Sequence, residues 1–169
     1  MAKHPSLCIY TSVLALFLAA CGSSTPGGGS TGASPTGDPA SAAKFVGNWT
    51  AQAGAAEVDD CDMKSDTIPL TGTFAISLPS AGSGFIQSLS SNGCLLKWTA
   101  NGNVATLSGT ETCTVAGAEG GSWQATFVTG TLTLAGTSIA LQDKGNGVLT
   151  IDSVNGNCSF TQSGTFNGN

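Results

Sequence analysis

The sequence predicts an all-β domain: an antiparallel meander that closes into a β-barrel of about 8–10 strands, with a β-sandwich as the alternative architecture. Within 45–169, short runs of β-branched and aromatic residues recur between Gly, Asn and Ser turns about every 8–12 residues. No window shows the 3.6-residue apolar period of an amphipathic helix. With no helix to cover a sheet face, closing the sheet on itself is the simplest way to bury its apolar side.

The strands expected from this pattern are 45–53, 67–78, 84–90, 94–100, 103–109, 122–129, 131–135, 137–142, 147–152 and 157–166. The strongest local prediction is a hairpin with a two-residue Asn-Gly loop at 101–102, because both loop positions tolerate a positive φ. That loop predicts pairing of Trp98 with Ala105 and of Leu96 with Leu107, all four on one face. In the next segment the apolar positions are odd-numbered up to Phe127 and even-numbered from Leu132, which predicts a bulge or turn at Gly130.

Residues 1–20 have the pattern of a lipoprotein signal peptide. A short basic start precedes an apolar run at 7–18, which suits a signal-peptide core and is too short to cross a bilayer. The run ends in Leu18-Ala19-Ala20-Cys21, which resembles the bacterial lipobox. That resemblance implies that Cys21 is lipidated, with palmitate among the acyl chains, and becomes the mature N-terminus. In enterobacterial lipoproteins an acidic residue after the lipidated cysteine is the inner-membrane retention signal, and this chain has Gly22 there instead. We therefore expect a lipid-anchored envelope protein, in the outer membrane.

The segment 21–44 is expected to be the lipidated cysteine followed by a disordered tether. It is rich in Gly, Ser, Thr and Pro, and before Lys44 it has no large apolar side chain. Such a segment cannot bury enough surface to offset its ordering entropy. The remaining residues, 45–169, are then one β-barrel domain.

Four cysteines remain in the expected mature domain: Cys61, Cys94, Cys113 and Cys158. An even number of cysteines in an exported domain indicates disulfides. Three pairings are possible. We favour Cys94–Cys113, which closes the hairpin with its next strand, and Cys61–Cys158, which ties the start of the barrel to its end. A zinc site is a poor alternative because the sequence has no CxxC motif and its one His lies in the signal peptide.

The functional groups of the expected mature chain argue against an enzyme. The single His and the single Tyr both lie in the signal peptide, and the chain has no Arg. Triads and dyads that need His, His-ligated metals and Arg anion clamps are therefore excluded, and no cofactor is expected. The formal net charge of −5 also argues against a nucleic-acid partner.

One acidic cluster, 57–66, stands out, and we interpret it as a solvated loop between the first two strands. No metal site is predicted with any strength, but a Ca²⁺ site is an alternative, since hard cations take several carboxylate oxygens from one loop. A glycosidase-type carboxylate pair is a more remote alternative. The candidate ligands are Glu57, Asp59, Asp60, Asp62 and Asp66.

The start of the domain, Phe45-Val46-Gly47-Asn48-Trp49-Thr50, resembles the Gly-x-Trp strand of lipocalin-like (calycin) barrels. The resemblance implies that Trp49 packs across the barrel floor. The chain departs from that pattern in lacking the Arg that often covers this Trp. The whole arrangement of the chain resembles exported lipoproteins of myxobacteria. It consists of the lipobox, the tether, the Gly-x-Trp strand and the CxLxW strand at 94–98. This resemblance implies an architecture and a location but no activity.

Two functions are compatible with these observations. In the first, the barrel binds a small apolar ligand in a cavity lined by aromatic residues. In the second, a filled barrel serves as a structural or interaction lipoprotein, with the membrane as partner through its lipid anchor and with an envelope protein as a further partner. The candidate lining residues are Phe74, Phe85, Trp98, Trp123 and Phe127.

Overall fold

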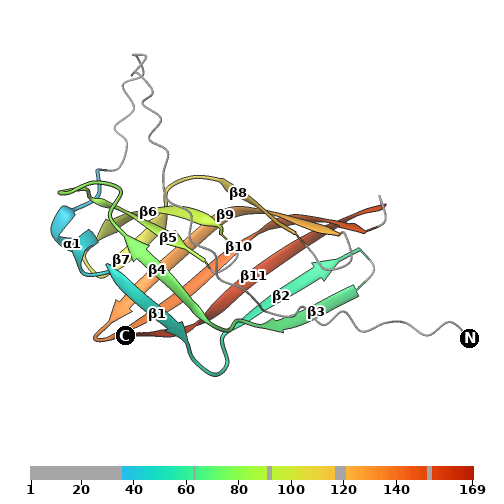
Figure 1. Ribbon diagram of the computed structural model, residues 1–169, viewed down its shortest axis with the longest axis horizontal. Coiled ribbons are helices and arrows are strands. Elements are labelled where there is room, and N and C mark those ends of the chain that lie inside the picture. Colours follow the sequence, from blue (N-terminus) through green and yellow to red (C-terminus); the bar gives the residue numbers. More distant parts are fainter. Residues whose placement is uncertain (1–35, 63, 91–92, 117–120, 152–153) are drawn as a thin grey trace, which may run out of the picture. The chain divides into compact units, whose positions relative to one another are not determined.

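The computed structural model describes residues 36–62, 64–90, 93–116, 121–151 and 154–169. Within these residues the fold is nearly all-β and contains a closed antiparallel 8-strand barrel with extra strands, as the sequence predicts (Figure 1).

The elements follow the chain in this order: α1 (Pro39–Ala43), β1 (Gly47–Ala51), β2 (Ala56–Cys61), β3 (Lys64–Pro69), β4 (Thr73–Ser77), β5 (Phe85–Leu89), β6 (Leu95–Asn101), β7 (Val104–Leu107), β8 (Glu111–Ala116), β9 (Ser122–Ala135), β10 (Ser138–Ile151) and β11 (Val154–Gly168).

The barrel strands neighbour one another in the order β1-β4-β5-β6-β7-β9-β10-β11, and pairing of β1 with β11 closes the ring. At this closure Trp49 lies opposite Gly168. Every one of these pairings is antiparallel. The sheet therefore has no free edge around the barrel itself, which removes the usual site of edge-to-edge aggregation.

Three long strands, β9, β10 and β11, continue beyond the barrel into a second part of the sheet. There β8 pairs with β9, and β2 pairs with β11 and carries β3 on its other side. We call this second part the sheet extension: β8, β2 and β3 with the segments of β9–β11 that lie between them. Figure 1 shows β2 and β3 toward the end of the domain opposite α1. Among the described residues β3 pairs with β2 alone.

The barrel interior is packed with large apolar side chains. Strand alternation turns every second residue inward, so that Ile139 and Leu141 of β10 are buried while Ala140 and Gln142 are exposed. Trp98 is 1% exposed, and its indole Nε1 donates a hydrogen bond of 2.9 Å to Ser88 Oγ. The most deeply buried large side chains are Trp98, Phe45, Phe160, Ile86, Leu132 and Ile139.

The N-terminal helix α1 belongs to the domain, although residues 36–44 were expected in the tether. Asp38 caps it by accepting hydrogen bonds from the backbone amides of Ala40 and Ser41, and Pro39 fits the first turn. Ser41 Oγ accepts a hydrogen bond of 2.8 Å from the amide of Gly102, and Ala42 is fully buried. Sequence composition conceals this helix because its buried side is made of small residues.

The Asn-Gly hairpin forms between β6 and β7, but its predicted register is wrong by two residues. Trp98 pairs with Leu107, and Asn101 pairs with Val104, so the loop is 102–103. Gly102 takes the positive φ of +62° that the turn requires. A shift of two residues preserves side-chain alternation, and the predicted inward face is therefore correct.

The other differences concern the number, length and irregularity of the strands. The expected strand 67–78 is divided between β3 and β4, and β2 and β8 were not predicted. Two expected strands, 122–129 and 131–135, are one continuous strand, β9. The expected strands 137–142 and 147–152 are likewise one continuous strand, β10. Gly130 lies within β9 and not at a turn, and the register shift falls between Lys144 and Gly145, where Val128 of β9 has no partner on β10. A Cβ atom on Gly130 would lie 2.9 Å from the Trp98 ring, so the glycine leaves space for that indole.

Candidate functional site

The five aromatic residues proposed to line a ligand cavity divide into three groups. Trp98 and Phe127 belong to the buried core, while Phe74 and Trp123 are partly buried and pack against it. Phe127 and Trp123 each meet the ring of Phe160 edge-on, at centroid distances of 5.0 and 6.1 Å. Phe85 begins β5 in the phase opposite to inward-facing Ile86. Four of these side chains therefore pack in or against the hydrophobic core, and Phe85 faces outward.

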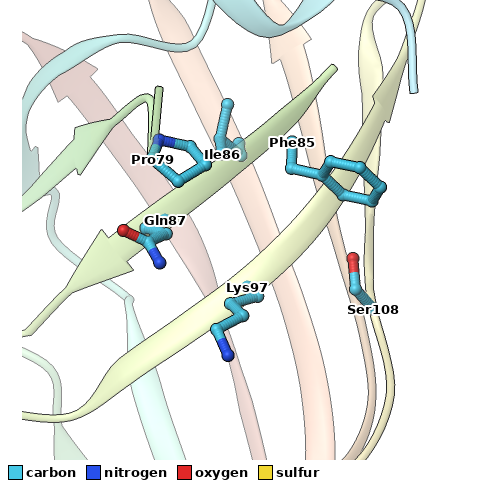
Figure 2. Close-up of a pocket in the computed structure, with 6 residues that line it drawn as sticks. All are labelled: Pro79, Phe85, Ile86, Gln87, Lys97 and Ser108. Atoms are coloured by element: carbon cyan, nitrogen blue, oxygen red, sulfur yellow. The ribbon is translucent and has the colours of Figure 1, made fainter. Parts of the chain in front are cut away.

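Two open grooves lie on the described residues, and most of their lining side chains face outward. The first, of about 280 Å³, lies where β5 and β6 run side by side, and Figure 2 shows Phe85, Gln87 and Lys97 around it with Pro79 and Ser108 at its margins. The second, of about 230 Å³, lies over β9, β10 and β11 and is lined by polar side chains such as Gln124 and Asn146. The first groove combines an apolar wall with one lysine.

The acidic cluster 57–66 was predicted to be a loop, and this prediction is wrong. In the structure the cluster forms the β2–β3 hairpin. Alternation in β2 separates its acids: Glu57 and Asp59 lie on one face and Asp60 on the other. Its cross-strand pairing explains why a segment rich in charge forms strands, since Asp60 Oδ1 accepts a hydrogen bond of 2.6 Å from Ser65 Oγ across the hairpin.

The five Ca²⁺ candidates are consequently not assembled into one site. Asp62 lies beyond the end of β2, where its carboxylate is 3.4 Å from the backbone nitrogen of Asn157. Asp60 also faces away from Glu57 and Asp59. Within the described part of the chain, no three acidic, His or Cys side chains are grouped so that they could hold a metal ion. The physical reason is the two-residue period of a strand, which sends neighbouring carboxylates to opposite faces.

The sheet instead brings a distant acid, Asp143, to the inner-face acids of the hairpin. In register, Asp143 of β10 lies opposite Gln162 of β11, and Gln162 lies opposite Glu57 of β2. Residues directly opposite one another share a face, so these three side chains form one row across the sheet. Asp59, two positions from Glu57, lies on the same face, opposite Asp66 of β3. We call Glu57, Asp59, Asp66, Asp143 and Gln162 the carboxyl row.

Asp143 is the most unusual member of the carboxyl row. It is 6% exposed, and neither of its carboxyl oxygens accepts a hydrogen bond of ordinary geometry. Burial and the negative charge of nearby Glu57 together raise the pKa of Asp143 to about 8. The backbone amide of Gln162 lowers this pKa, but by less than the other two effects raise it. Desolvation penalises the charged carboxylate more than the neutral acid, so Asp143 is mainly protonated at neutral pH.

Asp59 has the same tendency to a smaller extent. Burial, together with the charge and hydrogen bonding of Glu57 and the charge of Asp66, raises the pKa of Asp59 to about 7. Its Oδ1 is buried and has no hydrogen-bond partner in the structure. Glu57 itself accepts a hydrogen bond from the side-chain amide of Gln162. The carboxyl row can therefore hold and release protons near neutral pH.

Sequence reasoning missed Asp143 as a site residue, although one signal was present. The positions that share its phase are Ile139, Leu141, Gly145 and Gly147, all without polar side chains. An aspartate in the middle of an inward-facing apolar phase departs from strand alternation, and such a departure indicates a buried carboxyl group.

The disulfides have the pairing favoured from the sequence. Cys61 and Cys158 lie directly opposite each other on β2 and β11, with their Cα atoms 4.0 Å apart. Cys94 and Cys113 join the start of β6 to β8, with a Cα–Cα distance of 5.5 Å. We call the first the hairpin-anchoring disulfide and the second the β6–β8 disulfide. The first lies within the sheet extension, and the second attaches the extension to the barrel.

The fold and the site together define a closed antiparallel β-barrel with a disulfide-linked sheet extension. Comparison with family models, curated proteins and solved structures finds no match to this chain. Along the described part of the chain, no helix has the length and apolarity needed to cross a membrane. The signal-peptide, lipobox and Cys21 predictions lie outside the described residues.

Proposed function

We propose that this protein is a lipid-anchored bacterial envelope protein whose β-barrel is a filled scaffold that meets an envelope protein partner through its outer surface. The observation that carries the proposal is the packed interior: Trp98, Ile86, Leu132 and Ile139 are each at most 1% exposed. A barrel of eight strands has an interior that side chains can fill. Ligand pockets of drug-sized molecules occupy about 300–1,000 Å³ and enclose most of their ligand.

The envelope location is supported by the lipobox-like Leu18–Cys21 segment and by the disulfides, since disulfides persist in oxidising compartments. Lipid attachment at Cys21 is tested by growing cells with labelled palmitate. The wild-type chain should carry the label and fractionate with membranes. A Cys21→Ser variant should lose the label, and retention of the label would contradict the anchor.

The filled interior is tested against the alternative, binding of a small apolar ligand within the barrel. The purified full-length chain is mixed with a fluorescent fatty acid, and quenching of tryptophan emission is followed. We expect no stoichiometric uptake by the wild type. A Leu132→Ala variant tests the same interior with a smaller probe: it opens an apolar cavity and should take up benzene, whereas the wild type should not. Micromolar binding of the fatty acid by the wild type would instead establish the ligand-binding function.

An outer binding surface is tested at the groove beside β5 and β6. Phe85 and Lys97 supply its apolar wall and its charge. A photo-crosslinking residue at position 85 should yield a discrete crosslinked product in intact cells. The same residue at position 133, an exposed threonine on β9, is the control and should not yield that product. A product from both positions, or from neither, would contradict a partner at this groove.

A further inference from the structure

We infer that the β2–β3 hairpin is a pH-dependent flap. Its strand β2 stays paired with β11 while Asp143 is neutral and separates from β11 when Asp143 ionises. This inference is independent of the anchoring and partner proposals above, because it depends only on the carboxyl row and on the pairing of the sheet extension.

The first argument is the surroundings of Asp143. The charged or titratable groups that share its face are four acids, Glu57 and Asp59 on β2, Asp66 on β3 and Glu111 on β8, together with Lys64, the first residue of β3. From β11 it faces the uncharged Gln162. From β9 its partner is Gly130, over which the Trp98 ring packs.

No lysine of the described strands pairs in register with Asp143, Gln162 or Glu57. Lys144, next to Asp143 in β10, has the opposite strand phase and is exposed, and Lys97 is likewise exposed on the outer side of β6. Lys64 pairs in register with Cys61, one row farther from Asp143 than Asp66 is. An ionised Asp143 would therefore be a buried charge with like charges beside it, a state that is strongly disfavoured without hydration or a counter-ion.

The second argument is which element can move to admit water. Asp143 lies in β10, which is paired on both sides along almost its whole length. The β2–β3 hairpin, in contrast, is held to the sheet through one edge, from Ala56–Ser163 to Cys61–Cys158. Its other edge, β3, has no further strand partner among the described residues. Releasing the hairpin thus breaks one set of ladder hydrogen bonds and exposes the inner face that carries Glu57 and Asp59.

The third argument is that the flap has a tether and a hinge. The hairpin-anchoring disulfide joins β2 to β11 at the tip of the hairpin, so Cys61 stays beside Cys158 and β2 separates from β11 between this point and Ala56. At the other end the chain between β1 and β2 includes Gly54, whose φ of +92° is accessible mainly to glycine. The opening is therefore local and reversible, while the barrel strands keep their pairing.

The experiment is amide hydrogen exchange of the full-length protein from pH 6 to 9.5, expressed as protection factors to remove the intrinsic pH dependence of exchange. In the wild type, protection of Ala56–Cys61 should fall with increasing pH. The loss should approach tenfold per pH unit below the folded-state pKa of Asp143, about 8, and should level off above it. Protection in β10 near Leu141 should stay constant. In Asp143→Asn, a neutral residue of the same shape, protection of β2 should be independent of pH.

Asp60→Asn is the matched control, because it removes a carboxylate of the same strand that faces the other way, and its pH profile should match the wild type. If Asp143→Asn does not fold, Glu57→Gln serves instead: without that negative charge the pKa of Asp143 falls, so the loss of protection should level off at a lower pH than in the wild type. An unchanged profile in Asp143→Asn, or in Glu57→Gln where that variant is used, would overturn the inference. Suppression of the alkaline opening by millimolar CaCl₂ would also overturn it and would identify the row as a cation site.

Discussion

The substitution Gly145→Ala should severely destabilise the domain, because the alanine methyl group has no space at the register shift between β9 and β10. A Cβ atom at position 145 would lie 2.1 Å from the backbone oxygen of Thr126 and 2.6 Å from the ring of Phe160. Relief requires movement of a central strand or of a ring that is 2% exposed. Over-packing of a well-packed core typically costs about 1–3 kcal/mol, and a backbone obstacle should place this variant at or above about 3 kcal/mol.

Two neighbouring glycines provide graded controls. At Gly147 the Cβ atom would meet the Trp123 ring at 1.9 Å, but that ring is partly exposed and can turn away. We therefore expect a smaller loss for Gly147→Ala, of about 1–2 kcal/mol. At Gly156 the nearest atom lies at 4.0 Å, and Gly156→Ala should be neutral or stabilising by up to about 1 kcal/mol through the lower entropy of the unfolded chain.

The assay is urea unfolding of the oxidised protein, followed by far-UV circular dichroism so that Trp123 does not dominate the signal. The free energy of unfolding should decrease in the order Gly156→Ala, Gly147→Ala, Gly145→Ala. If Gly145→Ala has a free energy of unfolding within about 0.5 kcal/mol of Gly156→Ala, the steric reasoning is refuted.

Three further predictions concern other parts of the fold. Serine at both positions of the hairpin-anchoring disulfide should lower the free energy of unfolding by about 5 kcal/mol, and serine at both positions of the β6–β8 disulfide by about 3 kcal/mol, because the sequence separations are 97 and 19. Equal losses in urea unfolding would contradict the loop-entropy argument. Asp143 and Asp59 keep protons in the folded state up to about pH 8 and 7, whereas unfolded aspartates lose them near pH 4, so the folded state binds more protons in this range. The thermal midpoint should consequently fall as pH rises from 4 to 8, and Asp143→Asn should flatten the profile; a midpoint that rises over this range would contradict the pKa directions. Ser88→Ala removes the acceptor of buried Trp98 Nε1 and should cost about 1–3 kcal/mol, while Thr112→Ala, at an exposed hydroxyl, should change stability by less than about 0.5 kcal/mol; equal effects in urea unfolding would rule out the buried hydrogen bond as the cause.

Much of the fold could be predicted from the sequence, because alternation and turns act locally. The all-β class, the inward face of β6 and β7 and the disulfide pairing all follow from these signals. The Gly-x-Trp strand also begins the barrel, with Trp49 buried beside Gly168 and Phe74. The hairpin register could not be predicted, since a shift of two residues preserves the same alternation and only the loop geometry distinguishes the two registers.

The candidate site could not be predicted for a different reason. Charge density in 57–66 argued for a loop, but the β2–β3 ladder and the partner strand β11 override that local preference. The approach of Asp143 to Glu57 depends on two long-range pairings, and no local pattern specifies which strand lies between them. The acids of the hairpin were thus identified correctly as a group, while their division between two faces and the distant partner required the tertiary register.

The pairing of β1 with β11 has a consequence for the order of events during biosynthesis. The ring closes through the pairs Trp49–Gly168, Thr50–Asn167 and Ala51–Phe166. The first barrel strand therefore obtains this partner only when residues more than a hundred positions later have been synthesised. A nascent chain that lacks those residues has two unpaired strands and no closed sheet. Folds dominated by such non-local pairings form slowly. The ring therefore closes only after the last strand has been synthesised.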